Sequence, residues 1–174
     1  MTQSEWTKRT FNFDFPEGLF PVIISRLRGA YPRIHDLTKN VSDQILSLQI
    51  YDKWSIKQQI GHLSDLEELH TARINDFKNN AKILSAWDGT NKKTFEADHN
   101  NKSIVKVLEE FKLGRDNFLD QLLTFSEKEL KITSLHPRLQ KQMRVVDMAF
   151  FVIEHDDHHI AKMWEIIDWN KNQI

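Results

Sequence analysis

Hydrophobic residues recur at helical spacing in four long stretches of the chain, which are residues 19–38, 55–80, 101–125 and 145–169. In the third stretch, Ile104, Val107, Leu108 and Phe111 follow the i, i+3, i+4, i+7 spacing of one helix face. Few glycines and prolines interrupt these stretches, which favours long helices over many short strands. The pattern therefore predicts four long helices, each with one buried face.

Local signals refine the ends and the shape of two of these helices. Ser55 and Gln58 have the spacing of a capping box, which places the start of the second helix. Pro32 lies inside the first helix and predicts a kink, because proline lacks an N–H donor and its ring clashes with the preceding turn. Residues 41–46 and 125–130 each contain a serine before a short helical turn. These two similar turns also allow an internal repeat of two helix–turn–helix halves.

The remaining segments determine how the helices connect. Residues 1–18 form an N-terminal arm, in which Phe11, Phe13 and Phe15 alternate and favour an apolar strap on the bundle over a short strand. Residues 81–100 are the longest connection, and that length permits a crossover where a tight hairpin would be shorter. We therefore predict an all-α four-helix bundle with an N-terminal arm and one long crossover, in which 19–174 form a single domain.

Composition excludes several classes of protein. The 174 residues include 11 Phe and 5 Trp, enough apolar surface for a folded core, so a disordered chain is not expected. With no Cys, the chain has no disulfide scaffold, Cys-ligated zinc, iron–sulfur cluster or Cys nucleophile. A net charge of −1 argues against a nucleic-acid partner. No apolar run is long enough to span a membrane and the first residues are polar, so we expect a cytoplasmic protein.

Candidate chemistry is concentrated in the histidines of the second and fourth predicted helices. His155 and His159 are four residues apart, so they point the same way from the edge of the apolar stripe. Their burial requires a partner, which a hydrogen bond or a metal ion can supply. His62 lies at the flank of the apolar face of the second helix, where a core histidine and a third ligand are both plausible. Three imidazoles would leave one position open on a tetrahedral ion.

The other histidines are expected to have different roles. His35, His99 and His136 have no partner at ligand spacing and are expected to be structural or loop residues. His158 lies on the opposite flank from His155 and is expected to be solvated or to orient a ligand. A di-iron site is a rival interpretation, because Glu-x-x-His occurs at residues 67–70 and 96–99. The second copy lies in the polar connection and is not expected to face the interior.

The ordered set of motifs resembles the DinB/YfiT-like superfamily over about residues 20–170. The resemblance is carried by residues 27–34, the Trp54-Ser55 pair, and the segments Gly61-His62-Leu63-Ser64-Asp65, His136-Pro137-Arg138-Leu139 and Glu154-His155-Asp156-Asp157-His158-His159. It implies that His62, His155 and His159 bind one divalent ion, most often Zn or Ni. Members with assigned activities include thiol transferases that use bacillithiol or mycothiol and a thiol-dependent isomerase, while others are described only as hydrolases. Homodimers are common in the family.

The predicted function is therefore a divalent-metal-dependent enzyme that activates a low-molecular-weight thiol, as an S-transferase, or water, as a hydrolase, toward a small-molecule substrate. The alternative is a stress-associated metal-binding protein without catalysis. Asp65 and Asp157 are candidates to orient a ligating imidazole, with solvated helix positions as the other interpretation. Arg73 is a candidate for binding a cofactor carboxylate, or forms a surface ion pair. No residue is assigned as general base.

Overall fold

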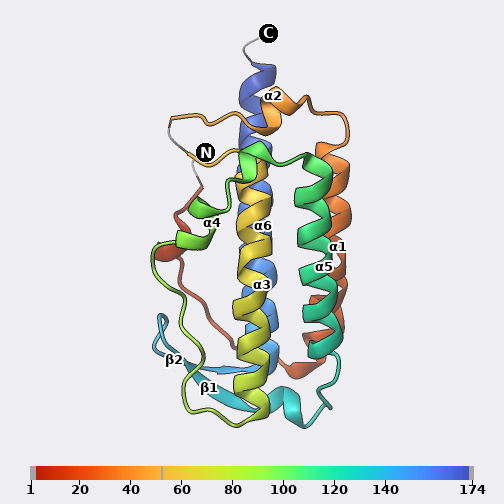
Figure 1. The fold of residues 1–174 in the computed structure, drawn as a ribbon. Coiled ribbons are helices and arrows are strands. Elements are labelled where there is room, and N and C mark those ends of the chain that lie inside the picture. The colour runs from red at the N-terminus through yellow and green to blue at the C-terminus, as the bar shows by residue number, and fades with distance from the viewer. Residues whose placement is uncertain (1–2, 52, 173–174) are drawn as a thin grey trace.

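The computed structural model describes residues 3–51 and 53–172, and its main elements are four long helices (Figure 1). These are α1 (Phe20–Thr38), α3 (Ile56–Lys78), α5 (Ile104–Leu122) and α6 (Val145–Lys171). The predicted four-helix bundle is confirmed. The predicted capping box is also present. The backbone N–H of Gln58 donates to Ser55 Oγ at 3.2 Å, and the backbone N–H of Ser55 donates to Gln58 Oε1 at 3.0 Å. Pro32 lies inside α1, which continues to Thr38, and a kink there stays a prediction.

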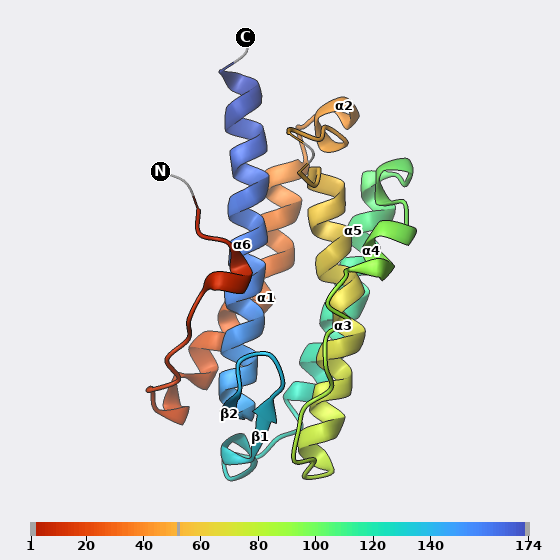
Figure 2. The same ribbon diagram turned by 90° about the vertical axis from the view of Figure 1, so that its left-hand side faces the viewer.

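The bundle has parallel neighbours where a simple up-and-down bundle would have antiparallel ones. Helices α3 and α5 run in the same direction side by side, and α1 and α6 run in the opposite direction (Figures 1 and 2). The chain must therefore return along the whole bundle between α3 and α5. It does so through the connection that carries α4 (Lys92–Glu96) and the 3-10 turn η3 (His99–Asn101). The predicted long crossover is confirmed, and it packs α4 and η3 against α3.

The shorter elements lie at the two ends of the bundle. The predicted helical turns are α2 (Asp43–Leu46) and the 3-10 turn η4 (Glu129–Lys131). Between η4 and α6, strands β1 (Thr133–His136) and β2 (Lys141–Arg144) form an antiparallel hairpin, with Thr133 opposite Arg144. This hairpin was not predicted, because strands of four residues are too short to show a hydrophobic period. It closes the lower end of the space between α3 and α6.

The N-terminal arm lies along α6 and contains two 3-10 turns, η1 (Trp6–Lys8) and η2 (Glu17–Leu19) (Figure 2). Phe11 is buried, and Phe13 and Phe15 pack against the core. Arg144 fastens the arm, since its Nη2 donates to the carbonyl oxygens of Phe13 and Phe15 at 3.0 and 2.9 Å. From residue 3 to residue 19 the described arm contains no strand, so the strap interpretation is confirmed. The division into an arm and one domain stays a prediction.

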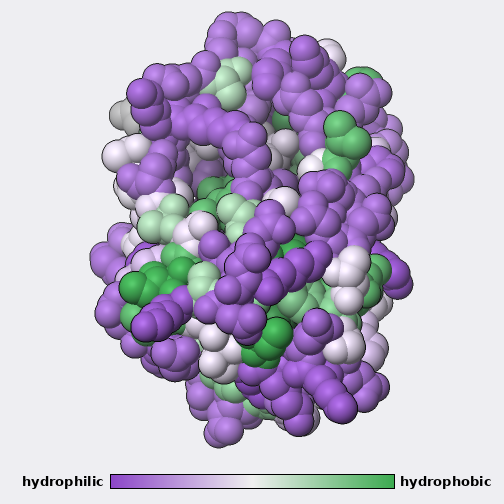
Figure 3. Space-filling model, turned by 60° about the horizontal axis from the view of Figure 1, so that its bottom comes forward, coloured by the Kyte–Doolittle hydropathy of each residue, from purple (hydrophilic) through white to green (hydrophobic). Residues whose placement is uncertain are grey.

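The core is formed by the apolar faces that the periodicity predicted. Its fully buried members come from all four long helices and include Leu27, Ile34, Ile60, Leu63, Phe77, Phe111, Phe118 and Val152. Seen with its lower end forward, the surface is mostly hydrophilic, and hydrophobic residues appear in separate small patches (Figure 3). Within the described residues, every helix is too short or too polar to cross a membrane.

Candidate metal centre

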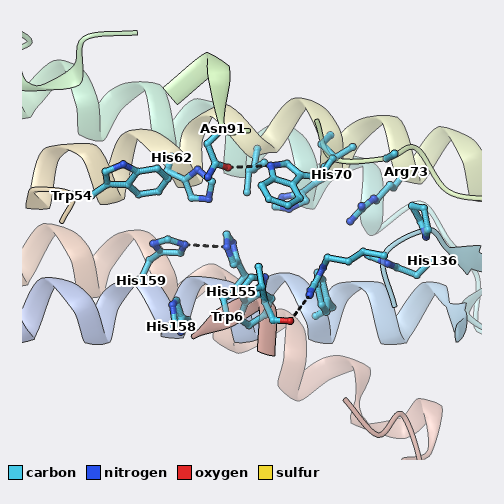
Figure 4. A pocket seen from close by; sticks show the side chains of 18 residues that line it. Trp6, Trp54, His62, His70, Arg73, Asn91, His136, His155, His158 and His159 are labelled. Atoms are coloured by element: carbon cyan, nitrogen blue, oxygen red, sulfur yellow. Dashed lines mark hydrogen bonds between the residues drawn. The ribbon is translucent and has the colours of Figure 1, made fainter. Parts of the chain in front are cut away.

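Three histidines from two facing helices converge inside the bundle. His62 projects from α3, and His155 and His159 project from successive turns of α6 (Figure 4). Each offers one ring nitrogen, and these three atoms all lie within 4.8 Å of one another. His155 Nε2 and His159 Nε2 are 3.0 Å apart. The three imidazoles that the sequence analysis singled out therefore converge at one point.

Two side chains from different elements orient these imidazoles. Gln59, one turn before His62 on α3, places its Oε1 2.5 Å from His159 Nδ1. Thr94 of α4 places its hydroxyl oxygen 3.2 Å from His62 Nδ1. An amide oxygen only accepts, so Gln59 fixes the proton of His159 on Nδ1 and leaves a lone pair on Nε2. The Thr94 contact likewise leaves His62 Nε2 as the nitrogen free to bind another group.

The environment keeps all three rings neutral. Burial lowers the pKa of His62 from 6.5 to about 4. Burial also lowers the pKa values of His155 and His159 well below 6.5, and repulsion from the neighbouring histidines lowers them further. A neutral imidazole is the form that binds a metal ion. The cluster therefore offers lone pairs near neutral pH without first having to lose protons.

These pKa shifts predict that the metal-free protein loses stability in mild acid. The unfolded chain binds protons on these histidines below about pH 6.5, whereas the folded chain resists protonation down to about pH 4 for His62. The free energy of unfolding is therefore expected to fall as the pH drops through this range, by at most about 1.4 kcal/mol per pH unit for each histidine. Urea denaturation in the presence of a chelator, near pH 7.5 and near pH 5, measures the free energy of unfolding at each pH. Equal free energies of unfolding at the two pH values would contradict these lowered pKa values. In His62→Ala, the fall in stability between pH 7.5 and pH 5 should be smaller than in the wild-type protein.

The histidine cluster opens into a cavity of about 430 Å³ between α3 and α6. Trp54, whose ring centroid lies 4.7 Å from that of His62, closes one end. Trp6 of the arm covers His155, with ring centroids 4.7 Å apart. The cavity runs from the cluster past His70 toward the β1–β2 hairpin (Figure 4). A small molecule in this cavity would therefore be surrounded largely by aromatic and apolar side chains and would reach all three histidines.

A buried ionic network lies behind the cluster and ties three helices together. Arg115 of α5 donates from Nε to Glu67 Oε1 of α3 at 2.7 Å and from Nη2 to Asp156 Oδ1 of α6 at 3.0 Å. All three residues are almost completely buried. Burial alone would lower the pKa of Arg115, because it disfavours the charged guanidinium. Attraction to the two carboxylates is stronger than this effect, so the pKa of Arg115 is raised. Because Asp156 follows His155 directly, the network fixes the turn of α6 that presents this ligand candidate.

This network also argues against the di-iron interpretation. In the first motif, Glu67 forms an ion pair with Arg115. In the second motif, the two side chains lie in different environments, because Glu96 is at the surface beside Lys92 and His99 is buried. His99 is buried in the crossover against α3, as a structural residue would be. Gly61 makes room for it, because a Cβ at position 61 would lie 2.3 Å from the His99 ring.

The predicted orienting carboxylates do not contact the three histidines. Asp65 Oδ2 lies 2.9 Å from His99 Nε2. Asp157 forms ion pairs with Arg26 and Arg33 of α1, at 2.5 and 2.7 Å. The interpretation that either aspartate orients one of the three is wrong, because the side chains that do so, Gln59 and Thr94, lie elsewhere in the sequence. Sequence reasoning gave no signal for Thr94, whose position depends on the crossover.

Other expectations on single residues also changed. His158 is buried beside Trp6 and His159, so the solvated interpretation is wrong. Arg73 is buried and lines the cavity, so the surface ion pair is also wrong. His136 is buried, as a structural residue would be, but it lines the cavity too. His35 is exposed on α1.

Comparisons with known proteins agree with this fold. The family model of the DinB superfamily matches residues 26–163. A solved structure of YfiT from Bacillus subtilis, described as a probable metal-dependent hydrolase with an unusual four-helix bundle topology, is similar at a TM-score of 0.76. It shares 16% sequence identity over 91% of each chain, a likeness that shows the fold alone. No curated protein matches the chain. Because the family model spans most of the sequence, this protein belongs to the DinB superfamily.

Proposed function

We propose that this protein is a metal-dependent enzyme in which His62, His155 and His159 hold one divalent ion, Zn or Ni. The observation that carries the proposal is the convergence of three buried, neutral imidazoles at a cavity of about 430 Å³. The description of YfiT as a metal-dependent hydrolase supports the same class. The substrate is a small molecule, because the cavity is enclosed between two helices and has the volume of an ordinary ligand site.

The donor set fits a divalent ion of this kind. Imidazole nitrogen suits Zn and Ni, and the oxygen partners of His62 and His159 fix the rings so that the remaining nitrogens are free. The proximity of His155 Nε2 and His159 Nε2 is costly for two lone pairs unless a proton or a cation lies between them. Three protein ligands also leave coordination open for a further group, as in catalytic sites.

When bound, the ion would supply Lewis-acid chemistry that stabilises the anionic form of a thiol or of water. The protein supplies the remaining parts. Gln59 and Thr94 hold two imidazoles in place, and Trp6 and Trp54 shield the cluster from solvent. His70 also lines the cavity, with Glu67 Oε2 3.5 Å from its Nδ1, and offers its imidazole to a bound molecule. An external thiol is compatible with a chain that has no Cys.

The experiment is a comparison of the two reactions on one preparation of zinc- or nickel-loaded protein. One arm offers bacillithiol, mycothiol or glutathione with a dinitrohalobenzene, and the other offers nitrophenyl esters and amides. We expect turnover in one arm that requires the metal and is lost in His155→Ala. Conjugation identifies a thiol transferase, and hydrolysis without thiol identifies a hydrolase. Tight metal binding without turnover in either arm would favour the non-catalytic metal-binding alternative.

A further inference from the structure

The end of the cavity that lies farthest from Trp54 is built from basic side chains. Arg73 comes from α3 and His136 from the end of β1 (Figure 4). Arg138 comes from the turn that follows β1. The two arginines are close enough to His136 to repel a proton there, which adds to burial in lowering the pKa of His136 to about 3. The cavity thus has the histidine cluster at one end and two guanidinium groups with a neutral imidazole at the other.

Within the part of the chain that the structure describes, Arg73 and Arg138 lack the carboxylate partners that the arginines bridging elements of the fold have. Arg115 and Arg144 both lie within ion-pair distance of acidic side chains. By contrast, no Asp or Glu oxygen of residues 3–51 and 53–172 lies within 4.0 Å of Arg73 or Arg138. Arg73 is only 3% exposed, and burial lowers its pKa to about 10 although Asp76 lies nearby. A buried guanidinium without a counter-ion is costly, so the site is electrostatically incomplete.

The side-chain nitrogens left without a partner at this end are donors. Arg73 Nε donates to the Ser85 carbonyl oxygen at 3.0 Å, and Arg138 Nη1 to that of Thr7 at 3.3 Å. Arg138 Nη2 is buried and has no partner among the described residues. His136 Nδ1 accepts from the Leu139 amide at 3.2 Å, so the ring proton lies on Nε2, which is also buried without a described partner. An acceptor is the group that would satisfy these donors.

We propose that this end of the cavity binds the carboxylate of an organic acid, with Arg73, Arg138 and His136 as its donors. Guanidinium groups match the two oxygens of a carboxylate in geometry and charge. Leu66, Leu69 and Phe151 line the cavity between the two ends, so the body of the acid is apolar. This inference rests on the proposed function only for the other end of the acid, whose reactive group would lie at the three histidines.

The test compares an acid with its uncharged amide on metal-free protein. Hydrocinnamate and hydrocinnamamide have the same apolar body, and calorimetric titration in a chelator measures the affinity of each. We expect the acid to bind at least about tenfold more tightly than the amide. Arg138→Met removes a partly exposed side chain and should abolish this preference with little effect on folding, and Arg73→Met should do the same. Arg28→Met, an exposed position on α1, is the matched control and should keep the preference.

Equal affinity for acid and amide, no measurable binding of the acid, or a preference that survives Arg138→Met would overturn the proposal. These results are independent of the metal, because the titrations are made in a chelator. Failure of the proposed function would appear instead as an absence of zinc binding by the wild-type protein in a separate titration. Circular dichroism of each variant shows that the fold is retained, and Arg138→Met decides the question if Arg73→Met does not fold.

Discussion

Replacing His155 by alanine is expected to abolish stoichiometric zinc binding. The variant retains only two of the three convergent imidazoles, from α3 and α6. Changes in residues that merely orient a ligand lower metal affinity about 10–100-fold, so the loss of a ligand should lower it by more than about 100-fold. Calorimetric titration with zinc measures the affinity directly. The same loss should appear in thermal unfolding, because a ligand at about 100 times its dissociation constant adds about 2.7 kcal/mol to stability.

His35→Ala is the control for this experiment. His35 is exposed on α1, far in sequence from the cluster, and its replacement should leave the zinc isotherm unchanged. Without metal, His155→Ala should remain folded, since the wild-type ring is buried at a desolvation cost and its pKa is depressed by that burial. Zinc binding by His155→Ala at wild-type affinity would mean that the ion binds at a different site.

Replacing Arg115 by methionine is expected to cause the largest loss of stability of any single change considered. The substitution leaves Glu67 and Asp156 almost completely buried without their counter-charge. Removing one partner of a buried ion pair costs about 3–5 kcal/mol, because the remaining charge is uncompensated. Urea denaturation measures the free energy of unfolding for both proteins.

Lys112→Met, one turn earlier on α5, provides the comparison. Lys112 pairs with Asp116 at the surface, where both side chains are about half exposed, and such pairs contribute at most about 1 kcal/mol. A second comparison adds Glu67→Gln and Asp156→Asn to Arg115→Met, which should recover part of the stability because no buried charge is left. If Arg115→Met is as mild as Lys112→Met, the network contributes little to holding α3, α5 and α6 together.

The predictions that succeeded rest on short-range patterns. Residues four apart on a helix lie on the same face, so His155 and His159 could be paired from their spacing alone. The capping box at Ser55 and Gln58 predicted the start of α3, because it too depends only on residues close together in the sequence. His62 was harder, since its position at the edge of an apolar face left two interpretations open. The resemblance to the family favoured the third ligand, and the structure places a His62 ring nitrogen within 4.8 Å of those of the other two.

The failures concern contacts between segments that are distant in sequence. Asp65 was a candidate to orient a ligating imidazole or a solvated helix position, but the crossover brings His99 to it instead. Thr94 reaches His62 by the same route. Arg138 lines the cavity because a hairpin of two short strands places it there, and neither strand is long enough to leave a periodic signal. Helical periodicity indicates which face is buried, but it does not indicate which loop will cover that face.

The parallel arrangement of α3 and α5 has a consequence for the order in which the protein folds. The contacts that the crossover makes with α3 join residues far apart in sequence, by 32 positions for Thr94 with His62, 34 for His99 with Asp65 and 45 for Asn100 with Ser55. Closing loops of this size is slow compared with helix formation. The individual helices are therefore expected to form before the crossover residues reach their positions around His62. A refolding chain should recover its helical signal before it gains the ability to capture zinc.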